Sequence, residues 1–276
     1  MSRPAVDSSV PSSRARAVTV PEFLAAKSRG QRLVLVTAYD YTQARLVDEA
    51  GVDAVLVGDS LGMVVQGLPD VLSVTLEEMI YHTRCVARGL KHALLIADMP
   101  FLTYQVSPEQ AVLNAGRLIK EGGAHAVKLE GGVRSREIIA ALVRADIPVM
   151  GHIGLTPQSV RRLGGFRVQR SQEQLLQDAQ AVVEAGAFAL VIECVPAAIA
   201  SAITASVPVP TIGIGAGAGC DGQILVLHDL LGLYPDLRPR FVKRYGELGE
   251  QTIAAVRRYA EEVRQGIFPS PEYELK

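Results

Sequence analysis

The run Ala124–Glu130 (AHAVKLE) decides the fold, because it reads as a buried strand that carries two charges. Successive side chains of a strand point to opposite faces, so Lys128 and Glu130 share one face. Val127 and Leu129 share the other face. We therefore expect the apolar pair to face covering helices and the charged pair to point into a closed barrel.

Seven more short apolar runs surround this one in the chain, and several also end on a charged residue. Each of the first seven runs is followed by a segment long enough for a helix. Strands that alternate with helices predict a parallel sheet, and eight such units predict an α/β fold of the single-domain (β/α)8 TIM-barrel type. The eight expected strands are Arg32–Asp40, Val52–Asp59, His92–Asp98, Ala124–Glu130, Ile147–His152, Phe188–Glu193, Val209–Gly215 and Gly222–Asp229.

Three segments are expected along the 276 residues: a disordered tail over 1–19, the barrel over 20–268 and a C-terminal tail over 269–276. The first tail is rich in Ser, Pro and Arg and has no apolar segment of the kind that a secretory signal needs. A short helix, Pro21–Lys27, is expected to close the bottom of the barrel. A terminal amphipathic helix is expected over Glu247–Gly266.

The composition indicates which kinds of binding partner to expect. The formal net charge is −1, which gives no reason to expect nucleic acid or an anionic membrane surface as a partner. No stretch approaches the roughly 18–20 apolar residues of a spanning helix. The 3 cysteines lie far apart and are typical of reduced thiols in a cytosolic protein. Small-molecule partners and a cytoplasmic location are therefore expected.

Acidic residues end four of the expected strands: Asp59, Asp98, Glu130 and Glu193. The carboxyl ends of barrel strands form the active-site face. A buried charge without a partner costs several kcal/mol or is neutralised, so acids gathered there, together with Lys128, predict a metal at their centre. Carboxylate oxygens suit Mg²⁺, or Mn²⁺ in its place.

Such a site suggests chemistry on a 2-oxo acid. A metal on the keto oxygen would stabilise the enolate that forms when a neighbouring C–H is deprotonated. Lys128 could add positive charge to that oxygen or hold the substrate carboxylate, and Glu193 would be free as a general base. Spacing alone does not decide which acids bind the metal. Taken singly, Asp59-Ser60 could also be a helix N-cap, and His152 could be a core histidine or a neighbour of the ligands.

Several motifs, in order, carry a family resemblance. These motifs are Thr37–Tyr41 (TAYDY), Val57–Met63 (VGDSLGM), Ala97–Phe101 (ADMPF), Val127–Gly132 (VKLEGG), Gly151–Gln158 (GHIGLTPQ), Ile192–Pro196 (IECVP), Ile212–Gly217 (IGIGAG) and Cys220–Gln223 (CDGQ). With them, the chain resembles the ketopantoate hydroxymethyltransferase family over roughly residues 20–268.

The resemblance implies a reaction and an assembly. Members transfer a hydroxymethyl group from 5,10-methylenetetrahydrofolate to 3-methyl-2-oxobutanoate, which gives 2-dehydropantoate for pantothenate synthesis. They are cytoplasmic homo-oligomers, commonly decamers. By motif, Mg²⁺ would face three acids, directly or through water: Asp59, Asp98 and Glu130. The oxo acid would contact Asp59, Ser60, Asp98 and Lys128, and Glu193 would take the C3 proton.

Other functions remain open at this point. The main alternative is a related metal-dependent barrel that acts on 2-oxo acids as a C–C lyase or a mutase. Those lyases usually carry a Lys-Lys-Cys-Gly-His string, which this sequence lacks. A barrel that only binds ligands, or one that binds phosphosugars, would share the fold without this chemistry.

Overall fold

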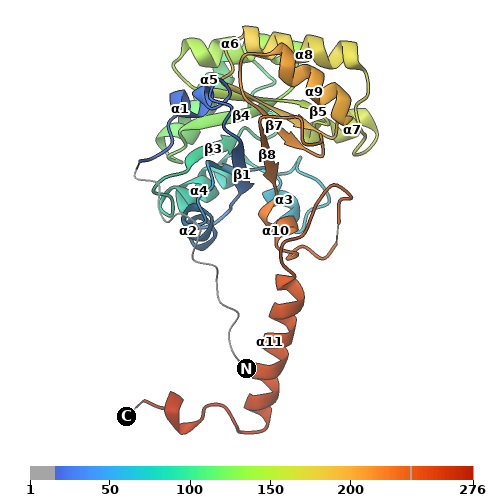
Figure 1. Ribbon diagram of the computed structural model, residues 1–276. Coiled ribbons are helices and arrows are strands. Elements are labelled where there is room, and N and C mark those ends of the chain that lie inside the picture. Colours follow the sequence, from blue (N-terminus) through green and yellow to red (C-terminus); the bar gives the residue numbers. More distant parts are fainter. Residues whose placement is uncertain (1–15, 237, 276) are drawn as a thin grey trace. The chain divides into compact units, whose positions relative to one another are not determined.

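Eight parallel strands pair in chain order and close into a barrel, because β1 also pairs with β8 (Figure 1). This confirms the predicted (β/α)8 architecture. The computed structural model describes residues 16–236 and 238–275. The strands are β1 (Leu33–Thr37), β2 (Ala54–Val57), β3 (Leu94–Asp98), β4 (Ala126–Glu130), β5 (Val149–Gly154), β6 (Ala189–Glu193), β7 (Thr211–Ile214) and β8 (Gly222–Leu225).

Helices follow the strands and surround the sheet in Figure 1. All of those in the barrel unit except Val160–Leu163 have buried residues, as expected for helices that cover a parallel sheet. In the barrel unit they are α1 (Val20–Ala25), α2 (Tyr41–Glu49), α3 (Leu61–Val64), α4 (Leu76–Ala87), α5 (Pro108–Lys120), α6 (Arg136–Arg144), α7 (Val160–Leu163), α8 (Gln172–Glu184) and α9 (Ala197–Ser206), with 3₁₀ turns η1 (Val133–Ser135) and η2 (Pro157–Ser159).

The expected eighth strand was too long. β8 ends at Leu225, and Leu227–Leu230 forms a short helix, α10. Its backbone makes helical hydrogen bonds, such as Leu230 N–H to the carbonyl of Val226 at 3.0 Å. A short apolar run cannot be assigned to strand or helix by periodicity alone, which explains the error.

Strand register sets the neighbours at the active-site end of the barrel. Asp98 of β3 is the partner of Lys128 on β4. Glu130 of β4 is the partner of His152 on β5, and Gly154 of β5 pairs with Glu193 of β6. Residues that lie 22 to 39 positions apart in sequence thereby become lateral neighbours on one rim.

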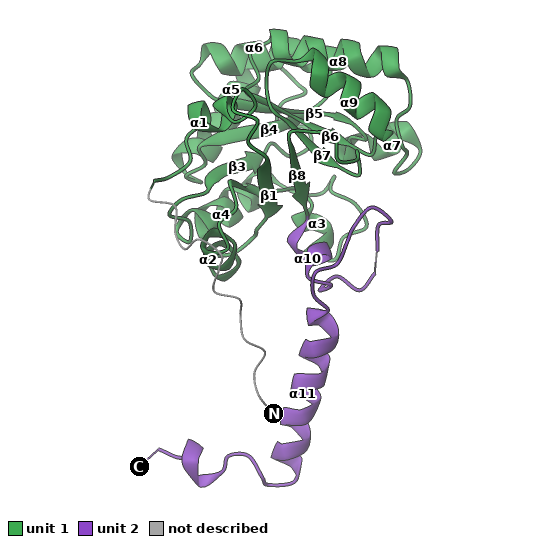
Figure 2. Ribbon diagram, viewed as in Figure 1, with its two compact units in different colours: residues 1–225 green, residues 226–276 purple. Residues whose placement is uncertain are grey.

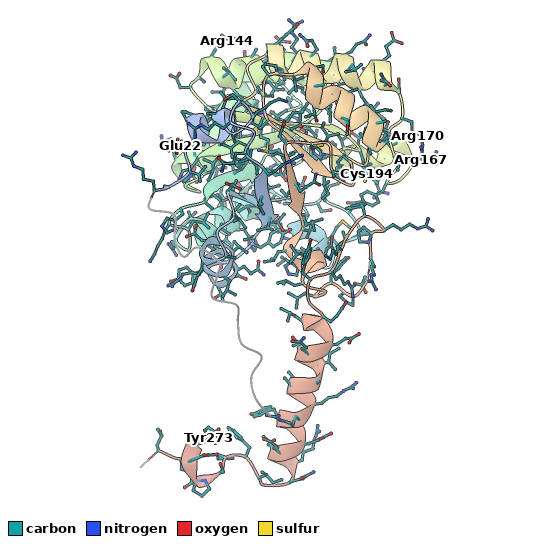
Figure 3. All side chains as sticks on the ribbon, viewed as in Figure 1. Glu22, Arg144, Arg167, Arg170, Cys194 and Tyr273 are labelled. Carbon is teal, nitrogen blue, oxygen red and sulfur yellow. The ribbon has the colours of Figure 1, made fainter. Side chains whose placement is uncertain are left out.

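The opposite end of the barrel is closed by α1, as the sequence suggested. Thr19 and Glu22 form a capping box at its start, and Glu22 is labelled in Figure 3. Phe23 is fully buried. Its ring packs edge-on against Phe188, with 5.7 Å between centroids. Val18 donates to the carbonyl of His92 at 2.7 Å, whereas residues 1–15 of the expected tail lie outside the described residues.

Residues from Val226 onward form a second compact unit, drawn purple in Figure 2. It contains α10, α11 (Leu248–Arg264) and the turn η3 (Pro271–Tyr273). No residue of α11 is buried. One side of it exposes four large apolar side chains: Ile253, Val256, Tyr259 and Val263. Among the described residues, no helix is long and apolar enough to cross a membrane.

Candidate active site

The structure brings the predicted residues together at the carboxyl ends of β2 to β6. Five of the side chains belong to residues that are at most 5% exposed: Asp59, Asp98, Lys128, Glu130 and His152. The side chain of Glu193 is more open, at 17% exposed. The contacts of Lys128 with Asp98 and of Glu130 with its neighbours on this rim confirm the inward orientation predicted for these two side chains.

Lys128 is paired with Asp98. Its Nζ lies 2.6 Å from Oδ1 of Asp98. The other oxygen, Oδ2, accepts a hydrogen bond from the backbone N–H of Asp59 at 3.1 Å. Both oxygens of Asp98 thus have a positively polarised partner, which is what a buried carboxylate requires.

Acidic side chains outnumber basic ones in this cluster. Burial, followed by the charge of Asp98, raises the pKa of Asp59 to about 7. Burial, followed by the charge of Asp59, raises the pKa of Glu130 well above its usual value. Burial opposes the charge on Lys128, but the surrounding carboxylates outweigh it and raise the pKa of Lys128. The lysine stays charged and offsets only part of the acid charge.

His152 lies between Lys128 and Glu193. Its Nδ1 is 3.4 Å from Nζ of Lys128, and its Nε2 is 3.2 Å from Oε2 of Glu193. Burial, and then the charge of Lys128, lower the pKa of His152, so the ring is neutral at pH 7. An ammonium group can only donate, so Nδ1 must accept and Nε2 carries the proton that faces Glu193. His152 is therefore a neighbour of the acid cluster and not a histidine that only packs in the core.

Ser60 does not act as a helix cap. It precedes α3 without a side-chain hydrogen bond to that helix. Its hydroxyl lies 2.8 Å from the hydroxyl of the buried Tyr39, which comes from the TAYDY stretch after β1. Ser60 therefore stands at the N-cap position of α3, but its hydroxyl pairs with Tyr39 and does not cap the helix.

Cys194 follows Glu193 directly and is labelled in Figure 3. It is buried, and burial raises the pKa of its thiol to about 12. A thiol in that state is a poor nucleophile at neutral pH. Its φ of 48° places it in the left-handed region, where the chain turns away after β6. The residue shapes the strand end and supplies no reactive group.

The donor set suits a hard divalent cation. Three carboxylates face one ammonium group, and burial, followed by the charge of a neighbouring acid, raises the pKa of Asp59 and of Glu130. Oxygen donors and surplus negative charge are what Mg²⁺ or Mn²⁺ requires. Within residues 16–236 and 238–275, no three acidic, His or Cys side chains already converge on one point. The carboxylates share one rim without a preassembled cage.

Sequence reasoning gave no role to two further residues, Gln158 and Tyr104. Gln158 donates through Nε2 to Oδ2 of Asp59, and Tyr104 donates to Oε1 of Gln158, both at 2.8 Å. Gln158 lies in the GHIGLTPQ stretch, but a single glutamine carries no signal of its partners. Both residues also line a cavity of about 600 Å³ that borders Glu130.

Comparison with known proteins identifies the family of this chain. The family model described as ketopantoate hydroxymethyltransferase matches residues 17–271. The chain belongs to the ketopantoate hydroxymethyltransferase family. This confirms the resemblance drawn from the motifs, and it makes the chain an enzyme of that family.

Curated relatives of the ketopantoate hydroxymethyltransferase family match almost end to end. A protein of Moorella thermoacetica named 3-methyl-2-oxobutanoate hydroxymethyltransferase is 60% identical, with 94% of this chain and 98% of the relative covered. A protein of the same name from Enterococcus faecalis is 55% identical, with 94% and 95% covered.

Solved structures share the fold. A phosphonopyruvate hydrolase, in complex with oxalate and Mg²⁺, aligns with a TM-score of 0.60 at 18% identity, covering 91% of this chain and 89% of the other. An oxaloacetate acetylhydrolase in complex with 3,3-difluorooxalacetate aligns with a TM-score of 0.59 at 17% identity, covering 93% and 90%. At this identity the likeness concerns the fold alone.

Proposed function

We propose that this enzyme transfers a hydroxymethyl group from 5,10-methylenetetrahydrofolate to 3-methyl-2-oxobutanoate. The C3–H bond of the oxo acid breaks, and C3 bonds to the methylene carbon of the donor. Both C–N bonds of the methylene carbon break, and water supplies the hydroxyl group. The proton from C3 and the remaining proton of water end on the two nitrogens, so that tetrahydrofolate and 2-dehydropantoate leave. The observation that carries the proposal is the partly exposed carboxylate of Glu193, 3.2 Å from His152 on the rim of a buried acid cluster.

Glu193 is the proposed base that removes the C3 proton. Its carboxylate is the most open of the acids, and the Nε2–H of neutral His152 faces one of its oxygens. With one oxygen of Glu193 facing His152, the second oxygen would receive the proton. Cys194, with its thiol pKa of about 12, offers no competing base beside it.

Lys128 and Ser60 are proposed to bind the oxo acid, together with Asp59 and Asp98. The ammonium group of Lys128 carries the positive charge that a substrate carboxylate or keto oxygen requires. The Ser60 hydroxyl, oriented by Tyr39 at 2.8 Å, supplies a neutral hydrogen bond beside it. The negative carboxylates exclude an anionic substrate unless a cation intervenes.

A divalent cation, Mg²⁺ or alternatively Mn²⁺, is proposed as the resident metal. Asp59, Asp98 and Glu130 would hold it, directly or through water, as the donor set and its surplus charge suggest. When bound, the cation would draw electron density from the keto oxygen and so make the C3 proton more acidic. The proton itself would still leave to Glu193.

The proposed assembly is a homo-oligomer, specifically a decamer, in the cytoplasm. The apolar side of α11 supports association, because Ile253, Val256, Tyr259 and Val263 are between 44% and 59% exposed. A stripe of large apolar side chains on a soluble helix is typical of an interaction surface.

Proton NMR of 3-methyl-2-oxobutanoate with Mg²⁺ and 5,10-methylenetetrahydrofolate tests the reaction. We expect the hydroxymethyl signal of 2-dehydropantoate to appear, and to disappear when EDTA is added. If no product forms while the donor is intact and metal is present, the proposed reaction is wrong at the level of its substrates.

A further inference from the structure

Gln158 contacts two acids of the cluster at once. Its backbone N–H donates to Oε2 of Glu130 at 3.0 Å, and its side-chain Nε2 donates to Oδ2 of Asp59 at 2.8 Å. The residue is 6% exposed and lies in the 3₁₀ turn η2 after β5. One residue thus bridges two carboxylates that repel each other and that come from different strands.

The orientation of the Gln158 amide is set by its neighbours. Nε2 also donates to the carbonyl of Met99 at 2.9 Å, which can only accept. On the other side, Oε1 accepts from the hydroxyl of Tyr104 at 2.8 Å and from Nε2 of Gln105 at 3.1 Å. A flipped amide would place its oxygen against the Met99 carbonyl, so one orientation is strongly preferred.

Tyr104 ties this amide to the strand that carries Glu130. It is 2% exposed, and its hydroxyl accepts from the backbone N–H of Glu130 at 3.2 Å. Burial, followed by the charge of Glu130, raises the pKa of Tyr104 well above its usual value, so the hydroxyl keeps its proton and remains a donor. The tyrosine therefore joins the amide of Gln158 to the backbone of Glu130.

We propose that Gln158, oriented by Tyr104, is a positioning residue that holds Asp59 and Glu130 for the divalent cation. It engages one oxygen of each carboxylate, so Gln158 leaves the second oxygen of each for another partner. The inference rests on the proposed metal-binding role of these two acids. Loss of such an outer partner typically weakens metal binding by about 10- to 100-fold.

Gln158→Met tests the inference, since it removes both side-chain donors at similar volume and keeps the backbone N–H. Mn²⁺ affinity is measured by electron paramagnetic resonance of the free ion, without oxo acid or folate. We expect the dissociation constant to rise by about tenfold or more. Gln180→Met, on the exposed side of α8, is the matched control and should leave it unchanged.

The kinetic readout separates positioning from general damage. For Gln158→Met, the KM for Mg²⁺ should rise by the same factor as the Mn²⁺ dissociation constant, and saturating Mg²⁺ should restore most of kcat. Damage to the fold would instead lower kcat and the melting temperature without a rise in the KM for Mg²⁺. A folded Gln158→Met variant with wild-type Mn²⁺ affinity overturns the proposal.

Tyr104→Phe is a milder second variant that removes only the hydroxyl. If Tyr104 acts through Gln158, it weakens Mn²⁺ binding, and the double variant is no weaker than Gln158→Met alone. Additive losses would overturn the role of Tyr104. A wild-type protein that binds Mn²⁺ but forms no product contradicts the proposed reaction only, whereas one that binds no Mn²⁺ overturns this inference.

Discussion

The ammonium group of Lys128 and the carboxylate of Asp98 lie 2.6 Å apart, both nearly buried. They are partners in the register of β3 and β4, so the pairing of two strands creates the pair directly. Lys128 also lies 3.4 Å from His152, whose far nitrogen faces Glu193. The registers of β4, β5 and β6 therefore link the proposed substrate-binding lysine to the proposed base.

Lys128→Met should disrupt substrate binding and stability together. The variant leaves Asp98 without its buried partner, which typically costs about 3–5 kcal/mol in the free energy of unfolding. We also expect the KM for the oxo acid to rise by about tenfold or more, because a charge-assisted contact is lost. Urea unfolding and initial-rate kinetics measure the two effects.

Lys27→Met is the matched control for Lys128→Met. Lys27 pairs with Asp221 at 3.0 Å at the opposite end of the barrel. The Lys27→Met variant should lower the free energy of unfolding and leave the KM for the oxo acid unchanged. A similar rise in KM for both variants would contradict a binding role for Lys128.

Glu193→Gln should abolish proton removal and spare binding. An amide cannot act as the base, and general-base catalysis typically contributes about 10²- to 10⁴-fold to the rate. We expect exchange of the C3 hydrogen of 3-methyl-2-oxobutanoate in D₂O, followed by NMR, to fall by that order. Exchange at the wild-type rate would remove Glu193 from the role of base.

His152→Phe should slow proton removal more than it weakens binding. The ring volume is retained, but the Nε2–H that faces Glu193 at 3.2 Å is lost. Loss of an N–H that faces a charged group typically costs about 1.5–3 kcal/mol, so we expect C3 exchange to slow by about tenfold or more. An unchanged exchange rate, with a raised KM alone, would show that His152 serves binding instead.

Asp48 provides a pH dependence that is independent of the active site. Its carboxylate accepts from the backbone N–H groups of Lys91 and His92 at 3.0 Å and of Ala93 at 2.8 Å. Burial raises the pKa of Asp48, but these three amides outweigh burial and lower it below 3.8. A lowered folded-state pKa means that the stabilisation is complete above the unfolded pKa and is lost as pH falls through the folded one.

Asp48→Asn should therefore lower the free energy of unfolding by about 2 kcal/mol at pH 7, because hydrogen bonds to a charge are lost. The difference in the free energy of unfolding between the variant and the wild type should become smaller as pH falls below about 4. Urea unfolding at several pH values measures it. Glu49→Gln, at the exposed neighbouring position of α2, is the control and should show no such gap.

Val256→Glu should reduce the size of the assembly. The side chain is 59% exposed within the apolar stripe of α11, where a charge would oppose burial against another copy. Size-exclusion chromatography with light scattering measures the mass, and Gln251→Glu, on another side of α11, is the control. A monomeric wild-type protein would contradict the proposed homo-oligomer.

Much of the fold could be predicted from this chain because its signals are local. Apolar runs, helix-length spacers and strand-end acids recur often enough to indicate eight βα units. Strand limits were less accurate, and the run after Leu225 became α10, because short apolar segments suit either structure.

Strand alternation places Lys128 and Glu130 on one face, so their inward direction could be predicted from the local sequence. Their partners could not be predicted, because these depend on how separate strands and loops pack. The register set Lys128 beside Asp98 and His152, and loop packing brought Gln158 and Tyr104 to Asp59 and Glu130. The physical reason is that side-chain direction follows from local backbone geometry, whereas contacts between distant residues depend on how separate strands and loops pack.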